Sequence, residues 1–102
     1  MAWVLAADCS ALDRAEVIGV DCGARRLALY KLGSAYFATD DVCPHEGGSL
    51  SEGTLEGNCI ECPLHAAQFD VRTGKADGAI TDDPVPTFKT KVENGQIYVD
   101  LD

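Results

Sequence analysis

Residues 43–65 of the chain read CPHEGGSLSEGTLEGNCIECPLH. It begins with Cys43 and His45 in the triplet CPH and ends, after sixteen intervening residues, with Cys62 and His65 in the quartet CPLH. These are the only two histidines of the chain, and each follows a cysteine by two or three positions. Thiolate and imidazole are both metal ligands, so we predict that Cys43, His45, Cys62 and His65 together bind metal.

Two kinds of metal centre fit this ligand set. Zinc takes two cysteines and two histidines in a tetrahedron. A [2Fe–2S] cluster takes two cysteines on one iron and two histidines on the other. In zinc fingers each knuckle generally supplies two ligands of the same residue type. Here residues 43–45 and residues 62–65 each supply one cysteine and one histidine. The spacing therefore favours iron–sulfur modestly and leaves zinc open.

The C-terminal residues predict a β-hairpin. Asn94-Gly95 separates residues 88–93 from residues 96–101, and this dipeptide favours a type I′ turn. Ile97 and Val99 alternate with polar neighbours, which places one apolar face inward.

The remainder predicts short strands around two irregular segments. Glycines punctuate strand-like runs at residues 17–21 and 26–32 and an aromatic stretch at residues 36–37, as in a meander of hairpins. Residues 40–57 hold five glycines or prolines and no strong strand pattern. A similar segment covers residues 63–78, and residues 58–61 form a short run between the two. We expect two loops projecting from the same end of a sheet. A short helix is expected within residues 10–16, with Ser10 as its cap and Asp13 in its first turn.

Length and cysteine count limit the function. The chain has 102 residues, the size of one domain, and no apolar run near the roughly 18 residues that span a bilayer. No positive residue precedes the short apolar stretch at the N-terminus, so no signal peptide and a cytoplasmic location are expected.

The five cysteines are an odd number, which argues against a disulfide framework. Cys9, Cys22 and Cys59 lack a nearby histidine and are expected to be reduced thiols.

The charge excludes one class of partner. Eight basic against 17 acidic residues give a net charge of −9, which repels phosphate backbones, so we expect no nucleic-acid binding. The acidic surface either steers the protein toward a basic partner or serves solubility alone. Arg25 and Arg26 are expected to be solvated charges on a strand face.

The spaced motifs at residues 43–45 and 62–65 closely resemble the Rieske cluster motif. The similarity extends through residues 36–39 (YFAT), residues 49–57 (SLSEGTLEG) and residues 69–75 (FDVRTGK). In motif and length the chain resembles the ferredoxin components of bacterial aromatic-ring dioxygenase systems.

This resemblance implies the Rieske fold, an all-β arrangement of stacked antiparallel sheets. Base sheets would occupy residues 1–41 and 82–102, and a cluster-binding subdomain of two loops residues 42–81. Cys43 and Cys62 would hold the inner iron, and His45 and His65 the outer iron at the surface.

One departure from the resembled family and two differences from Rieske proteins of the cytochrome bc type bear on the site. Ala66 stands where glycine is frequent; a positive φ there would cost about 1 kcal/mol. Gly48 and Leu64 occupy the positions where proteins of the cytochrome bc type have a disulfide. Ala67 and Phe69 replace a serine and a tyrosine whose hydroxyls bond near the cluster. Because fewer such bonds lower the potential, we predict roughly −150 mV, the low end of the Rieske range.

The resemblance implies an electron carrier rather than an enzyme. It would take electrons from an NADH-dependent flavin reductase and deliver them to a terminal Rieske non-haem iron oxygenase, docking transiently as a monomer. No histidine remains for a mononuclear iron site, so oxygen chemistry on this chain is excluded. The alternatives are a non-catalytic Rieske-like small subunit of a larger reductase and a zinc-binding interaction module.

Overall fold

The computed structural model describes residues 2–44, 47–64, 66–78 and 80–101. Within these residues every strand pairing is antiparallel, so the predicted all-β class is confirmed. The elements in chain order are β1 (Trp3–Asp8), the 3₁₀ turn η1 (Cys9–Leu12), β2 (Val17–Cys22), β3 (Arg25–Leu32), β4 (Ala35–Asp40), the 3₁₀ turn η2 (Leu50–Glu52), β5 (Thr54–Glu56), β6 (Cys59–Glu61), β7 (Gln68–Asp70), β8 (Thr87–Phe88), β9 (Thr90–Glu93) and β10 (Gln96–Asp100).

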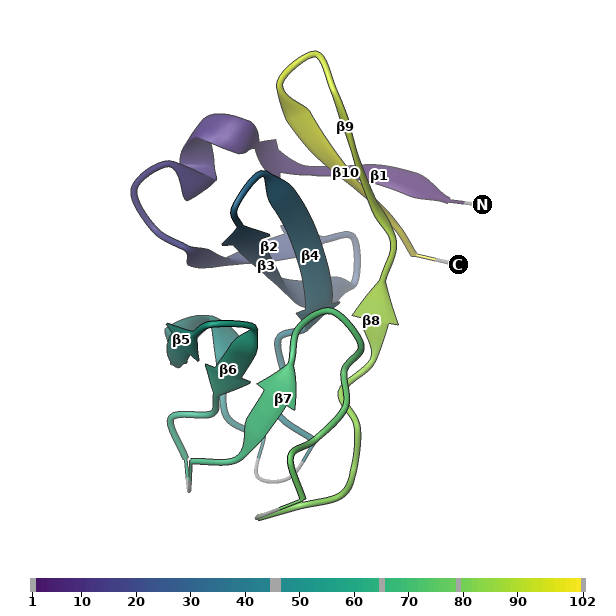
Figure 1. Ribbon diagram of the computed structural model, residues 1–102. Helices are drawn as coiled ribbons and strands as arrows, with labels where there is room; N and C mark the ends of the chain where they lie inside the picture. The colour runs from purple at the N-terminus through teal and green to yellow at the C-terminus, as the bar shows by residue number, and fades with distance from the viewer. Residues whose placement is uncertain (1, 45–46, 65, 79, 102) are drawn as a thin grey trace.

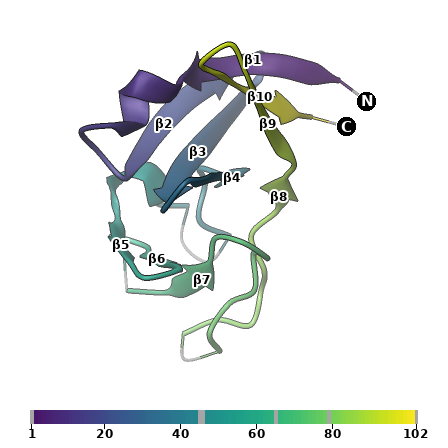
Figure 2. The same ribbon diagram turned by 45° about the horizontal axis from the view of Figure 1, so that its top comes forward.

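The strands form three sheets, ordered β1-β10-β9, β2-β3-β4-β8 and β5-β6-β7. In Figure 1 the first sheet lies at the top, the second in the middle and the small third sheet at the bottom. The third sheet lies below the second sheet in both views (Figures 1 and 2). The two expected loops begin close together, since Cys43 and Cys62 belong to the same core.

Strand β3 lies between two separate cores. Its alternate side chains point to opposite faces, as the period of a β-strand requires. Leu27 and Leu29 join the core shared with Ile97 of β10. Ala28 and Tyr30 join the core that contains the residues of β6 and β7. Because all four β3 side chains are fully buried, this strand connects the loop-bearing end to the rest of the molecule.

The predicted C-terminal hairpin is confirmed. Asn94 and Gly95 both have positive φ, at 53° and 75°, as a type I′ turn requires. Ile97 and Val99 are fully buried, so the apolar alternation in β10 does face the interior.

The predicted helix is only a four-residue 3₁₀ turn, and its caps differ from the expectation. Asp8, not Ser10, precedes the first helical residue, and its side chain makes no capping hydrogen bond. Asp13 ends the turn, where its N–H donates to the Ser10 carbonyl at 3.1 Å. Among the described residues, no helix has the length and apolar character that crossing a membrane requires.

Three strands were not predicted. β5 and β7 have three residues each, and in each strand only the central side chain points toward the core, so no repeating pattern forms. β1 contains the sequence WVLAAD, in which alanine gives little strand preference. Its pairing with β10 carries a bulge between Leu5 and Ala7, which further breaks the alternation.

Candidate metal centre

Two loops with matching backbone closures carry the predicted ligands. In the first loop the Cys43 N–H donates to the Gly48 carbonyl oxygen at 2.7 Å. In the second loop the Cys62 N–H donates to the Ala67 carbonyl oxygen, also at 2.7 Å. In both loops the acceptor lies five positions after the cysteine. The two cysteines are thus fixed at the start of hairpin-like loops of equal span.

Both cysteines are buried in the same core. Cys43 and Cys62 are each 1 % exposed, and they pack with Leu50, Ile60 and Phe69. An apolar shell of this kind excludes water from a metal site and thereby influences its redox potential. Two buried thiols at the base of neighbouring loops fit the inner iron of a [2Fe–2S] cluster.

The loops touch each other at Gly48. A Cβ built on Gly48 would lie 3.2 Å from the Cys62 Sγ atom and 3.1 Å from the Leu64 Cγ atom. The absence of a side chain at residue 48 therefore lets the first loop approach the thiol of the second. The same contact shows that residues 48 and 64 are neighbours, and neither is a cysteine that could form a disulfide.

The predicted ligands His45 and His65 lie outside the described residues, as does Glu46. In the parts of the chain that the structure describes, no group of three or more histidine, cysteine, aspartate or glutamate side chains is arranged to hold a metal ion. Cys43 and Cys62 are the two predicted ligands whose positions are described. The assignment of the four ligands therefore stays a prediction.

Ala66 follows the second predicted histidine and does have a positive φ. Its φ is 60°, in the left-handed region that glycine occupies without penalty. The side chain is exposed, so packing does not oppose the methyl group. Ala66 thus keeps the shape of the loop at a cost in backbone strain alone.

Ala67 and Phe69, which the resemblance placed at hydroxyl-bearing positions of the cytochrome bc type, are both fully buried. They belong to the same core as the two cysteines. Neither side chain supplies a hydrogen-bond donor there.

Asp70 ends β7 and fixes the turn that follows. Its Oδ1 accepts the Arg72 backbone N–H at 2.9 Å, and Arg72 Nη2 donates to Oδ2 at 2.9 Å. The hydrogen bonds from the Arg72 side chain, ahead of that from its backbone, hold the pKa of the Asp70 carboxyl below its usual value.

The remaining cysteines are not in disulfides. Cys9, Cys22 and Cys59 are free thiols, as predicted. Cys22 is buried, and burial together with the nearby Asp21 charge raises the pKa of its thiol.

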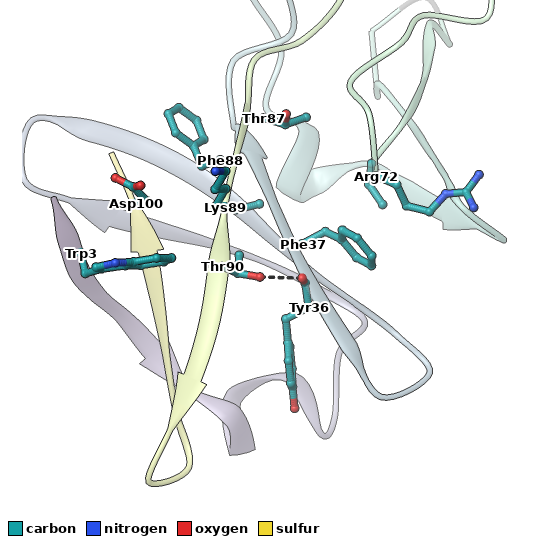
Figure 3. Close-up of a pocket in the computed structure, with 11 residues that line it drawn as sticks. Trp3, Tyr36, Phe37, Arg72, Thr87, Phe88, Lys89, Thr90 and Asp100 are labelled. Carbon is teal, nitrogen blue, oxygen red and sulfur yellow. Dashed lines mark hydrogen bonds between the residues drawn. The ribbon is translucent and has the colours of Figure 1, made fainter. Parts of the chain in front are cut away.

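A groove of about 610 Å³ lies outside the two loops, and sequence reasoning did not identify it. It lies between the β4–β8–β9 region and the turn after β7, and its lining includes Phe37 and Arg72 (Figure 3). Thr90 Oγ1 donates to the Tyr36 carbonyl at 2.7 Å along its wall. Neither Cys43 nor Cys62 lines it, so it is separate from the predicted metal centre.

Comparison with known proteins identifies the class. A profile of the Rieske [2Fe–2S] domain matches residues 2–89. Because this match covers most of the chain, the protein belongs to the Rieske [2Fe–2S] domain family. It accordingly carries one Rieske-type [2Fe–2S] cluster.

Several relatives of the chain are ferredoxins of aromatic dioxygenase systems. The chain is 40% identical over 99 residues to the ferredoxin component of the naphthalene 1,2-dioxygenase system of Pseudomonas putida, covering 97% of this chain and 95% of that protein. It superposes on the ferredoxin of Sphingomonas yanoikuyae B1 with a TM-score of 0.91 at 27% identity, covering 99% of this chain and 100% of the other.

A third relative is seen with a partner. The chain matches a structure described as a complex of reduced oxygenase and oxidized ferredoxin in carbazole 1,9a-dioxygenase, with a TM-score of 0.87 and 38% identity. The match covers 95% of this chain and 91% of that one. Together these similarities make the protein a ferredoxin-type electron carrier of the Rieske class.

Proposed function

We propose that the protein carries single electrons from an NADH-dependent flavin reductase to a terminal Rieske non-haem iron oxygenase that acts on aromatic compounds. The observation that supports this most strongly is the full-length similarity to the naphthalene dioxygenase ferredoxin component. The related ferredoxin found in a complex with its oxygenase supports the identity of the electron acceptor. The cluster, when bound, accepts one electron and returns it.

The proposed ligand set is Cys43 and Cys62 on the inner iron and His45 and His65 on the outer iron. The burial of both cysteines, each 1 % exposed, supports their place on the iron farther from solvent. The contact between Gly48 and the Cys62 thiol supports a shared centre, because it brings the two loops together. We also propose that residues 42–81 act as a cluster-binding unit on a base of residues 1–41 and 82–102.

Electrons would enter and leave at the loop end. Val42 and Leu64 are large apolar side chains that are 56% and 46% exposed, and each is next to a predicted ligand in the sequence. Exposed apolar side chains beside a redox centre suit a weak, transient interface. The protein would work there as a monomer in the cytoplasm, at a potential near the low end of the Rieske range, roughly −150 mV.

The proposal is tested by electron delivery. Purified protein, reduced anaerobically, would be mixed in a stopped-flow instrument with the oxidised oxygenase component of naphthalene 1,2-dioxygenase. After mixing with the oxygenase, we expect the visible absorption spectrum to change from that of the reduced ferredoxin to that of the oxidised ferredoxin. Steady NADH oxidation that requires the ferredoxin, a flavin reductase, the oxygenase and naphthalene together would complete the test. A ferredoxin that is reduced by the reductase but never reoxidised by any aromatic-ring oxygenase would contradict the proposal.

A further inference from the structure

Asp41 is a buried carboxylate at the base of the first loop. It follows β4 directly, precedes Cys43 by two residues and is 1 % exposed. Aspartate is rarely buried to this extent, because removing an ionised group from water is costly unless hydrogen bonds and an opposite charge replace the water. The contacts of Asp41 therefore show which hydrogen bonds and which opposite charge compensate for the burial of its carboxylate.

The side chain of Asp41 joins two elements. Its Oδ1 accepts the Ser51 backbone N–H of η2 at 2.7 Å. Its Oδ2 lies 3.5 Å from Nε of Arg26 on β3. Arg26 is half exposed, as expected for a strand-face charge, yet its guanidinium also reaches this buried acid.

The backbone of Asp41 joins the same two elements. Its N–H donates to the Arg26 carbonyl at 3.0 Å, and its own carbonyl accepts the Leu50 N–H at 2.7 Å. Residue 41 is thus bonded through both backbone and side chain to the strand beneath the loop and to the turn that closes the loop.

Gly19 on β2 leaves the space that this arrangement needs. A Cβ built at residue 19 would lie 2.7 Å from Arg26 Nη2 and 2.7 Å from Ser51 Oγ. Contacts this short do not occur in proteins, so any side chain at residue 19 would displace the arginine or the serine. Glycine at residue 19 therefore leaves the space in which the Arg26 guanidinium crosses β2.

The pairing continues from Asp41 to the predicted ligand. Val42 and Ser49 form an antiparallel bridge, and the next pair is Cys43 with Gly48, whose N–H···O distance is 2.7 Å. These two pairs close the loop, so that only residues 44–47 lie between Cys43 and Gly48 in the sequence. A change in the distance between residues 41 and 51 would be passed directly to Cys43.

We propose that Asp41, held by Arg26, is a positioning residue for the first cluster-binding loop, and that its fixed negative charge keeps the reduction potential of the cluster low. The inference rests on the proposed ligand set, in which Cys43 binds the inner iron. A negative charge in a buried, low-dielectric site opposes the addition of an electron nearby. Loss of that charge should therefore raise the potential and loosen the loop at once.

Asp41→Asn is the primary test, because asparagine keeps the size and one oxygen acceptor but removes the charge. Asp21→Asn is the matched control, since Asp21 pairs with the same arginine at 3.2 Å but is 76% exposed on β2. On cluster-loaded protein, the midpoint potential would be followed by visible circular dichroism, and cluster loss by colour development with an iron chelator. We expect a higher midpoint and cluster loss on the order of tenfold faster for Asp41→Asn, with neither change for Asp21→Asn.

An unchanged midpoint in Asp41→Asn, or equal shifts in both variants, would overturn the inference. If Asp41→Asn does not load the cluster, Arg26→Gln provides the test, because it keeps the carboxylate and its bond to Ser51 but removes the compensating cation. We expect a lower midpoint for Arg26→Gln at pH 8, and an unchanged or higher one would overturn the inference. Wild-type protein without a Rieske spectrum would instead overturn the proposed ligand set, so the two failures are distinguishable.

Discussion

Gly48 lies so close to Cys62 that a Cβ at residue 48 would be 3.2 Å from the Cys62 Sγ atom. This contact joins the two loops on which the proposed cluster site depends. The thiol of one loop thus packs against the bare backbone of the other.

Gly48→Ala should therefore disturb the site rather than the fold. The added methyl would also meet Leu64 Cγ at 3.1 Å, and overpacking of this kind costs about 1–3 kcal/mol. We expect faster cluster loss and an altered visible circular dichroism spectrum of the oxidised protein.

Gly57→Ala is the control for that substitution. Gly57 has a φ of 58° and no atom within 4 Å of its Cβ position, so alanine there strains a turn without touching the loops. The Gly57→Ala variant should have a free energy of unfolding about 1 kcal/mol below that of the wild type, with no change in the visible circular dichroism spectrum. Equal spectral changes in the two variants would show that the loop contact is not the cause.

Ala66→Gly should stabilise the protein. Because Ala66 holds a φ of 60°, glycine removes strain worth up to about 1 kcal/mol, which corresponds to a melting temperature higher by a few degrees. Asn94→Gly, at a φ of 53°, should gain less, because asparagine tolerates this conformation. A loss of stability in Ala66→Gly, measured by thermal unfolding of the loaded protein, would contradict the strain argument.

Ala67→Ser should raise the reduction potential. Residue 67 is fully buried in the core of the two cysteines, so a hydroxyl introduced there has a cluster sulfur as its expected partner. One added hydrogen bond of about 1 kcal/mol to the reduced state corresponds to a rise on the order of 50 mV for a one-electron couple. Ala76→Ser, in the same core, should leave the midpoint unchanged, and a redox titration that finds no difference between the variants would contradict this prediction.

Asp70→Asn should lose stability in a pH-dependent way. Hydrogen bonds from Arg72 lower the folded-state pKa of Asp70, so its contribution is present above the unfolded value of about 3.9 and disappears as the pH falls through the folded value. At pH 7 the Asp70→Asn variant should be half unfolded at a lower urea concentration than the wild type. This difference in urea concentration should shrink below about pH 4. A difference that grows toward acid would contradict the assigned direction.

The loops and the hairpin were predictable because local residues determine them. Asn94-Gly95 specifies its own turn, and the spacing of the cysteines and histidines specifies a metal centre without knowledge of the fold. The positive φ of Ala66 was raised as a possibility only by the resemblance, because alanine by itself gives no local signal for that conformation.

The Asp41 arrangement was not predictable, because its partners come from distant positions. Arg26 lies 15 residues before Asp41 and is brought to it by the pairing of β3 with β4. Ser51 lies ten residues after Asp41 and is brought to it by the closure of the first loop, in which the Leu50 N–H donates to the Asp41 carbonyl. In the sequence, Asp41 follows another aspartate and reads as part of an acidic surface. The strands β5 and β7 were missed for a related reason, since three residues with one inward side chain carry no period.

The proposed ligand set of two histidines and two cysteines is open to pulsed EPR of the dithionite-reduced protein, labelled with ¹⁵N-histidine. We predict two strongly coupled histidine nitrogens in the wild type, and His65→Cys should remove one of them. A spectrum of the reduced cluster with no histidine coupling would contradict the account.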